Sequence, residues 1–463
     1  RYLMNKFINI FIFTITLVSF LIIISKNETY LAFLPLSYMI GNIFLIISKN
    51  ANLNYTKYVM GVLGFIRFVL IPTLIAITGD KIIDSLPLGH SYFNKAIAYM
   101  SIEYVILTAI FLLLSNLFNK RKKLIQIYYL VGSKNVYYIF IVIVFLIFLV
   151  VPSTRESLSF LIIKTDATGR GSEETNSFAV LIRMYVQLAL ALIFVILSYR
   201  AYKIYQINPK FRYIILPLIL GLINISLIVG ERRSIQLYTL VSVLMITSVL
   251  FKKHRKKINS IILGVGIVVL GLMTLYKELY IFNYSSYSAA IRASSEKPLK
   301  IVDDLQSYFY GPSNVAASID YLNFYPGSLN QLGYDIGRSL FGLNFFIRSD
   351  RLITSQLFNE LIYGNQQLTG HLISSAGYGI IYFSPFLFFI PVLFNLILST
   401  IFEIIIRNTN GLEILFIATY MYVRVVTNMF GNPIPIVTLI SSVIVLYSII
   451  IFISILLKRP KNL

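Results

Sequence analysis

Long apolar runs separated by short polar segments dominate the chain. Each run has about 17–22 residues, enough to cross a hydrocarbon core of about 30 Å at about 1.5 Å per residue. Only helices satisfy their own backbone hydrogen bonds in lipid at this length. The pattern therefore predicts an all-α integral membrane protein with about 12 transmembrane helices. The predicted spans are 7–25, 30–48, 58–78, 98–118, 136–152, 178–199, 211–230, 234–251, 258–276, 384–406, 411–428 and 434–457.

Positive charge alternates between the loops. The chain has 463 residues and a net charge of +21, yet only 13% of its residues are charged. If the N-terminus is cytoplasmic, Lys and Arg concentrate in the inner loops, most strongly at 120–123 and 252–257. This is the positive-inside bias, and it predicts that both termini are cytoplasmic. The same bias accounts for the basic runs as juxtamembrane segments, so we expect membrane lipids and not nucleic acid as their partners.

Hydropathy divides the chain into three consecutive parts. Residues 1–276 carry the first nine predicted spans, residues 277–370 form a large extracytoplasmic loop, and residues 371–463 carry the rest. Helix-like apolar spacing at 300–322 and 350–363 predicts short amphipathic helices at the membrane surface. The stretch from His371 to Ile406 is too long for one span, so we expect a short re-entrant or surface helix followed by a true span.

Arginines gather in segments that this topology places outside or within the membrane. A guanidinium at such depth costs about 2–3 kcal/mol on insertion scales and needs a partner. One interpretation is a cationic cradle for a phosphate or pyrophosphate, because the planar fork matches phosphate oxygens. The other is snorkelling combined with ion pairs. The candidate pyrophosphate-binding residues are Arg183, Arg232, Arg233, Arg338, Arg348, Arg351 and Arg424. Arg67 and Glu103 also lie inside predicted spans, and the sequence indicates no partner for Glu103.

The large loop and the segment after it also offer acid–base groups and many tyrosines. His371, Asp320 and Asp335 are the candidate catalytic residues, because His or a carboxylate can accept a proton from a hydroxyl. Tyr308, Tyr310 and Tyr321 are candidate sugar-binding residues, since a ring stacks on sugars while its hydroxyl forms hydrogen bonds. An interfacial aromatic belt would explain the tyrosines equally well. The chain has no cysteine, and no ligand spacing indicates a metal site or a cofactor.

Three segments resemble bacterial oligosaccharide repeat-unit polymerases of the Wzy type, which are related in architecture to O-antigen ligases. The resemblance also rests on about a dozen spans with one dominant late outer loop. The matching segments are Gly230-Glu231-Arg232-Arg233-Ser234, Tyr308-Phe309-Tyr310-Gly311-Pro312, and Gly370-His371 followed by Ser374-Ser375-Ala376-Gly377-Tyr378-Gly379.

The resemblance implies a metal-independent glycosyltransferase in a bacterial plasma membrane, active on the extracytoplasmic side. It would transfer a glycan from polyprenyl pyrophosphate to the next lipid-linked repeat unit, building a capsular or O-antigen-type polysaccharide. Arginines would stabilise the leaving pyrophosphate, and His371, Asp320 or Asp335 would activate the acceptor hydroxyl. A flippase and a chain-length regulator are the expected partner proteins.

Three alternatives stay open. A flippase for lipid-linked oligosaccharides has a similar number of spans but usually lacks a long ordered outer loop. A polyprenyl-phosphate-sugar glycosyltransferase would need carboxylates in the first outer loop, where only Glu28 is present. A transporter of unrelated function would more often show paired acids within its spans.

Overall fold

The computed structural model describes most of the chain, in two compact units. The described residues are 2–48, 53–83, 89–118, 127–152, 158–160, 177–229, 234–281, 301–347, 351–363 and 373–458. Unit 1 comprises Arg1–Arg121, Leu299–Ile404 and Val425–Ser441, and unit 2 comprises Lys122–Pro298, Ile405–Arg424 and Ser442–Leu463. Each unit thus joins segments that lie far apart in the sequence.

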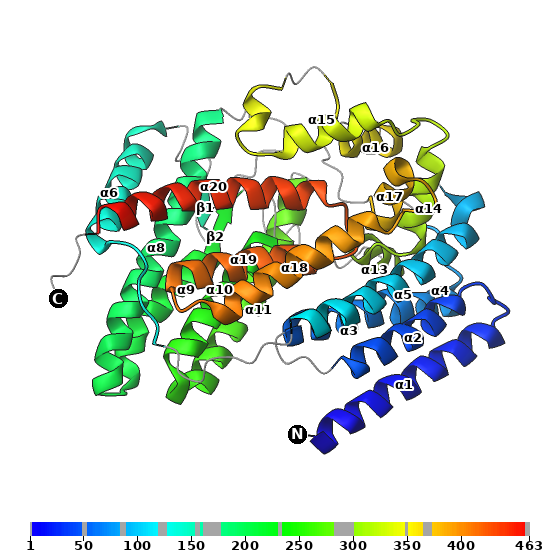
Figure 1. Cartoon of the computed structure of the whole chain (residues 1–463), viewed down its shortest axis with the longest axis horizontal. Coiled ribbons are helices and arrows are strands. Elements are labelled where there is room, and N and C mark those ends of the chain that lie inside the picture. The colour runs from blue at the N-terminus through cyan, green and yellow to red at the C-terminus, as the bar shows by residue number, and fades with distance from the viewer. Residues whose placement is uncertain are drawn as a thin grey trace. The chain divides into compact units, whose positions relative to one another are not determined.

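Unit 1 combines N-terminal helices with the helices of the large loop (Figure 1). Its N-terminal helices are α1 (Tyr2–Ser25), α2 (Phe33–Ile47), α3 (Asn54–Phe65), α4 (Ile71–Thr78) and α5 (Phe93–Leu117). Its loop helices are α13 (Ile301–Phe309), α14 (Pro312–Tyr321), α15 (Leu329–Ser339) and α16 (Thr354–Tyr363), and the short helix α17 (Ser375–Phe383) follows the loop. A π-helical turn, Ile66–Leu70, joins α3 to α4, so these form one continuous helix, Asn54–Thr78.

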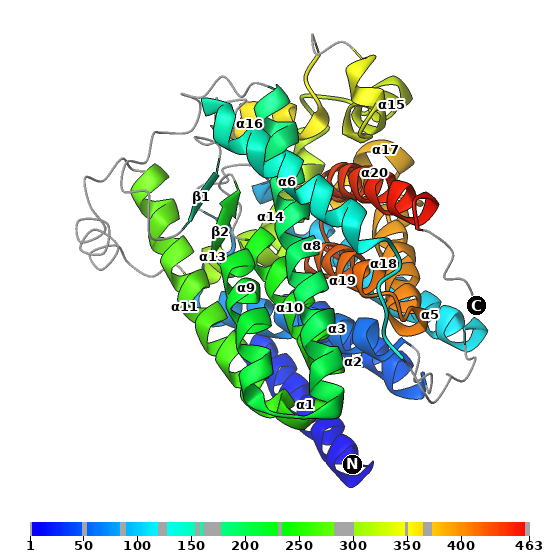
Figure 2. The ribbon, with the colours of Figure 1, turned by 90° about the vertical axis from the view of Figure 1, so that its left-hand side faces the viewer.

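Unit 2 is also helical, with one small ribbon (Figure 2). Its helices are α6 (Lys134–Val150), α8 (Ser177–Ile207), α9 (Ile215–Ser226), α10 (Ser234–Leu250) and α11 (Arg255–Ile281). The strands β1 (Leu158–Phe160) and β2 (Leu227–Val229) pair antiparallel. Three further helices contribute residues to both units, namely α18 (Ile390–Asn408), α19 (Leu412–Thr427) and α20 (Ile434–Leu456).

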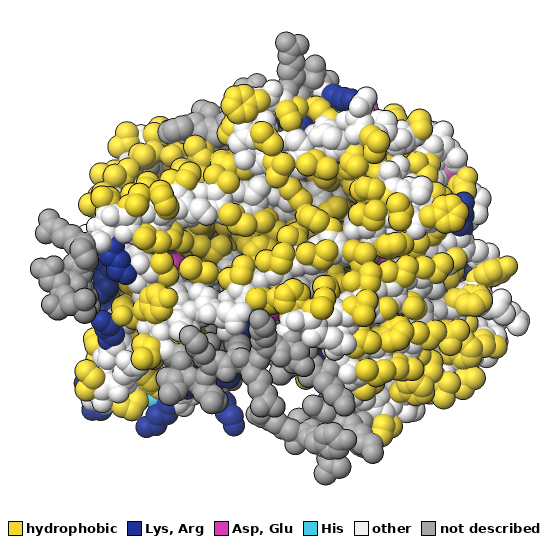
Figure 3. All heavy atoms as spheres, in the orientation of Figure 1, with side chains coloured by type: hydrophobic (Ala, Val, Ile, Leu, Met, Phe, Trp, Pro, Cys, Tyr) yellow, Lys and Arg dark blue, Asp and Glu magenta, His cyan; other side chains and the backbone are white. Residues whose placement is uncertain are grey.

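Among the described residues, five helices are long and apolar enough to cross a membrane, and a sixth if one bent pair counts as a single span. All twelve predicted spans overlap a helix, but several of these helices are shorter than 18 residues. Apolar side chains cover much of the face in Figure 3. The helices of spanning length are Asn54–Thr78, His90–Leu117, Leu181–Ile207, Ile390–Asn408 and Ile434–Leu456, and the bent pair is Ile235–Leu250 with Lys252–Val269 at 116°.

The lone charges Arg67 and Glu103 form an ion pair within unit 1. Arg67 Nη1 lies 2.7 Å from Glu103 Oε2, and both side chains are fully buried. The Arg67 Nε–H donates to the Tyr310 carbonyl at 2.9 Å, and the Ser375 hydroxyl donates to Glu103 Oε1 at 2.5 Å. The guanidinium also stacks over the Phe430 ring, 4.4 Å from its centroid. The pair therefore ties two spanning helices to the turn after α13 and to the start of α17.

Helix α14 is buried, so the prediction of a surface helix is wrong for this part of 300–322. Nine of its ten residues are buried. Small side chains such as Ala316, Ala317 and Ser318 let it pack closely against α5 and α17. A Cβ added at Gly377 of α17 would lie 2.3 Å from the Ser318 Cβ atom, which shows how near the two helices are. Short helices as such are confirmed by α13 in the same stretch and by α16 at 354–363.

The stretch predicted as a short helix followed by a span contains two separate helices. Helix α17 is short and largely buried, and α18, a helix of spanning length, begins at Ile390. Ser384 between them has a φ of +69° and a ψ of 163°, so no helix continues through it. The chain therefore packs one short helix into unit 1 before it enters a helix of spanning length.

We expect replacement of either ion-pair partner to destabilise the protein strongly. Arg67→Met or Glu103→Leu leaves one buried charge without its partner, which costs about 3–5 kcal/mol. The double replacement Arg67→Met/Glu103→Leu should recover much of that loss, because no isolated charge is left. Thermal unfolding of the purified protein in a neutral detergent checks both statements.

The exposed pair Glu28–Lys81 is the matched control. It has the same 2.7 Å separation, but its side chains are 30% and 44% exposed. Replacing either residue with Ala should change stability by less than about 1 kcal/mol. Equal shifts of the midpoint for the buried and the exposed pair would contradict the role assigned to Arg67 and Glu103.

Candidate functional site

A pocket of about 400 Å³ opens among the loop helices of unit 1. Its walls come from the end of α14, the turn into α15, the segment before α16, and α17. Tyrosines and a few polar groups share this wall with aliphatic side chains. The lining residues are Tyr321, Tyr325, Pro326, Gly327, Ser328, Gln331, Arg351, Leu352, Leu357, Ile381 and Tyr382.

The turn Pro326-Gly327-Ser328 shapes one edge of the pocket. A Cβ added at Gly327 would lie 1.9 Å from the Ile381 carbonyl oxygen, so only glycine allows the turn to reach α17. Ser328 then caps α15, because its hydroxyl accepts the Gln331 backbone N–H at 3.2 Å. This cap starts α15 where Gln331 lines the pocket.

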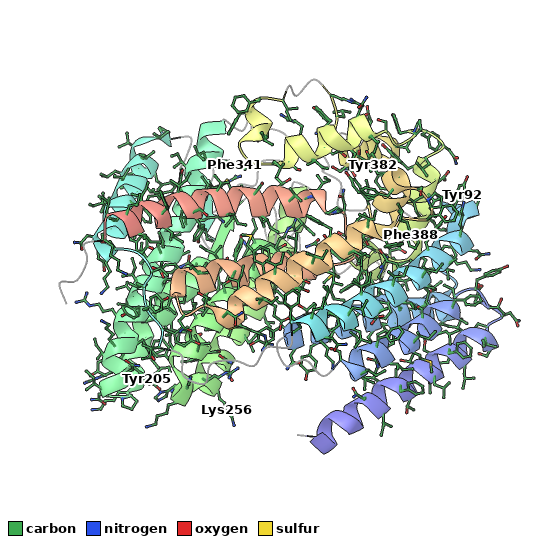
Figure 4. All side chains as sticks on the ribbon, viewed as in Figure 1. Tyr92, Tyr205, Lys256, Phe341, Tyr382 and Phe388 are labelled. Carbon is green, nitrogen blue, oxygen red and sulfur yellow. The ribbon has the colours of Figure 1, made fainter. Side chains whose placement is uncertain are left out.

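Three tyrosine rings form part of the wall. Tyr321 and Tyr325 stack with their centroids 5.3 Å apart, and Tyr382 packs against Tyr378 at 4.8 Å. Figure 4 shows Tyr382 on α17, below α15 and α16. Its hydroxyl is hydrogen-bonded to Thr354. Burial raises the pKa of the Tyr382 hydroxyl, so it is protonated at neutral pH.

Asp335 lies behind the pocket wall. Its side chain is 1% exposed, and Oδ1 accepts the Gln331 amide at 3.0 Å and the Thr354 backbone N–H at 3.1 Å. Oδ2 accepts the Tyr378 hydroxyl at 3.2 Å. Burial raises the pKa of Asp335, although these hydrogen bonds oppose the shift. The carboxylate joins α15, α16 and α17, and it acts on the pocket through Gln331.

Arg351 supplies the cationic group of the pocket wall. Its guanidinium lies over the Tyr334 ring, 5.7 Å from the centroid, and its side chain is exposed. The Tyr334 hydroxyl donates to the Arg351 carbonyl at 2.5 Å, which fixes the backbone there. An exposed guanidinium beside tyrosine hydroxyls is a suitable group for phosphate oxygens.

Asp320 has a different position from Asp335, at the end of α14. Its Oδ2 accepts the Gly89 backbone N–H at 2.8 Å, and Oδ1 accepts the Asn323 amide at 2.9 Å. Gly89 has a φ of +96° and lies against the backbone of Ala317, so a side chain there would be strained and would clash. The carboxylate thus fastens the segment before α5 to α14.

The other candidate residues are distributed over the chain. Tyr308 is 57% exposed on α13, whereas Tyr310 is 8% exposed and packs beside Gly431. Arg338 donates to the Ile347 carbonyl at 3.3 Å in unit 1. In unit 2, Arg424 donates to the Tyr238 hydroxyl at 2.9 Å, and Arg183 lies on α8. His371, Arg232, Arg233 and Arg348 lie outside the described residues.

The structure therefore brings three candidates together. Tyr321 and Arg351 line the pocket, and Asp335 holds its wall. Sequence reasoning missed Tyr325, Gln331 and Tyr382. The spacing of Gln331 and Asp335, four residues apart on one helix, was a signal for the hydrogen bond between their side chains. Among the described residues, no three His, Cys, Asp or Glu side chains lie close enough to hold a metal ion.

Comparison with protein-family models, curated proteins and solved structures finds no match to this chain.

The raised pKa of Asp335 predicts a pH-dependent stability. A buried carboxyl with a raised pKa favours the folded state most when protonated, below its ordinary pKa of 3.8. That contribution is lost as the pH rises through the raised value. Asp335→Asn keeps the shape and most of the hydrogen bonds but does not ionise. Its unfolding midpoint relative to wild type should therefore increase between pH 4 and pH 8, as measured by thermal unfolding.

Asp80→Asn, which replaces an exposed carboxylate, is the control for this comparison. The unfolding midpoint of Asp80→Asn relative to wild type should not change with pH in this way. An equal increase in Asp80→Asn, or a pH-independent difference between Asp335→Asn and wild type, would contradict the conclusion that buried Asp335 causes the pH dependence.

Proposed function

We propose that this chain is a membrane glycosyltransferase that joins lipid-linked oligosaccharide repeat units into a polysaccharide. The observation that carries the proposal is the pocket of unit 1, where tyrosine rings, an amide and a guanidinium face one space of about 400 Å³. Ring faces suit the apolar faces of sugars, while hydroxyl and amide groups bind their hydroxyls. Such a pocket can hold part of an oligosaccharide.

The proposed reaction separates a sugar from polyprenyl pyrophosphate. The acceptor hydroxyl attacks the anomeric carbon, the bond from that carbon to the pyrophosphate oxygen breaks, and the hydroxyl proton passes to a base. Negative charge then grows on the leaving pyrophosphate. Arg351 is the group of this pocket that would stabilise that charge.

Asp335 is assigned a positioning role and not that of the base. Both of its oxygens already accept hydrogen bonds within the wall, and it is buried. Asp320 is similarly engaged with Gly89 and Asn323. His371 stays the predicted base.

The proposed topology has 12 spans, cytoplasmic termini and an extracytoplasmic loop at 277–370. Five helices have spanning length, and four shorter apolar helices, Asn9–Ser25, Phe33–Ile47, Lys134–Val150 and Phe211–Ser226, would cross with local thinning of the bilayer. The two members of the bent pair, α10 and α11, and the helix α19 would supply the other three spans. The alternation of positive charge between loops supports the orientation. This arrangement would place the pocket on the outer face of a bacterial plasma membrane.

Deleting the gene and characterising the remaining lipid-linked glycans tests the reaction class. Single complete repeat units on the outer face, with the polymer lost, are the result expected for a polymerase. Complete units retained on the inner face would instead identify a flippase. Incomplete units would indicate an earlier glycosyltransferase.

Pocket variants test whether this site carries the activity. Arg351→Gln removes a charge-assisted contact and should lower polymer yield about ten- to a hundredfold. Tyr325→Ala removes an exposed ring of the pocket wall and should lower it between about two- and tenfold. Yield is measured at matched protein levels in the complemented deletion strain.

Phe346→Ala is the matched control, because Phe346 is an exposed aromatic residue of the same loop that does not line the pocket. Its polymer yield should stay at the wild-type level. Losses as large in Phe346→Ala as in Tyr325→Ala would place the activity elsewhere.

A further inference from the structure

Two basic segments of unit 2 meet at one end of its helices. The first includes the end of α8 and the residues that follow it, and the second joins α10 to α11. Their cationic side chains are all exposed, and none of them forms an ion pair within the described residues. Together they define a basic patch of Lys203, Lys210, Arg212, Lys252, Lys253, Arg255, Lys256 and Lys257.

Aromatic contacts hold the two segments together. The Tyr205 hydroxyl lies 2.9 Å from His254 Nδ1, and the rings of Phe211 and His254 are 5.7 Å apart. Lys257 Nζ lies 4.2 Å from the centroid of the Phe211 ring. Figure 4 shows Tyr205 and Lys256 at the same end of the helices. The patch is therefore a built surface and not two unrelated runs of charge.

The patch lies where apolar helices end. The spanning helix Leu181–Ile207 ends beside it, the apolar helix Phe211–Ser226 begins there, and the joint of the bent pair α10–α11 carries Lys252. Ile207, between the cations Lys203 and Lys210, is 88% exposed. Exposed aliphatic and cationic side chains side by side are typical of the level at which lipid headgroups meet acyl chains.

We infer that the basic patch binds the headgroups of anionic phospholipids. Lysine and arginine would contact the lipid phosphates, while Ile207 contacts the upper part of the acyl chains. Nucleic acids also offer phosphates, but the position at the ends of apolar helices favours lipid. The inference is independent of the pocket and of the proposed reaction.

Binding of fluorescent phosphatidylglycerol to the purified full-length protein in neutral detergent tests this inference. Lys253→Gln/Lys256→Gln should weaken the apparent affinity about five- to thirtyfold, because each cation near a lipid surface contributes about 1 kcal/mol. Raising the salt to about 1 M should weaken wild-type binding as well, since the screening length falls to about 3 Å. Phosphatidylcholine should bind far more weakly than phosphatidylglycerol.

Lys26→Gln/Lys95→Gln removes two exposed lysines of unit 1 and is the matched control, with wild-type affinity expected. Equal weakening in both double variants, or equal binding of the two lipids, would overturn the inference. So would binding of single-stranded RNA that the patch variant loses while its phosphatidylglycerol affinity is unchanged. All four replacements are on exposed side chains, so we expect the variants to fold. Gel filtration and circular dichroism check that they do.

Discussion

The Arg67–Glu103 ion pair holds together segments of unit 1 that lie far apart in the sequence. A charge enclosed among apolar helices is costly unless opposite charge and hydrogen bonds surround it. Arg67 reaches this state with one carboxylate, one backbone carbonyl and one aromatic ring. Glu103 adds the hydroxyl of Ser375. Five separate stretches of chain, including that of Arg67, must therefore come together at one point before either charge is tolerable.

The large loop therefore packs within the helical core of unit 1 and does not lie outside it. The Tyr310 carbonyl meets Arg67 from a residue with a φ of +54°, so the chain accepts a strained turn to deliver it. Helix α14 follows directly and is buried between α5 and α17. Helix α17 begins at Ser375, which donates to Glu103, and it carries Ile381 and Tyr382 of the pocket wall. The ion pair therefore also fixes the position of this wall.

Sequence patterns predicted the helices well because apolar length and spacing are local properties. The breaks at Pro326-Gly327 and after α17 could be read in the same way, from residues that end helices. The contacts between residues far apart in the sequence could not be predicted. Glu103 looked isolated because Arg67 lies 36 positions away, and only the packing of two helices brings them together. The burial of Asp335 and its hydrogen bonds to three other residues could not be predicted either, because the sequence shows a carboxylate but not its surroundings.

The prediction that α14 lies at the surface was wrong for the same reason, because the sequence does not show which helices pack together. Ala, Ser and Gly read as weakly hydrophobic, so hydropathy places such a helix at an interface. Small side chains also permit the closest packing between helices. This property explains why α14 is buried, with Ser318 packed against Gly377. A tightly packed α14 holds Tyr321 at its end in one position, and Asp335 does the same for Gln331 through buried hydrogen bonds. A pocket whose walls are fixed in this way loses little conformational entropy when a ligand binds, which suits recognition by ring contacts and a few hydrogen bonds.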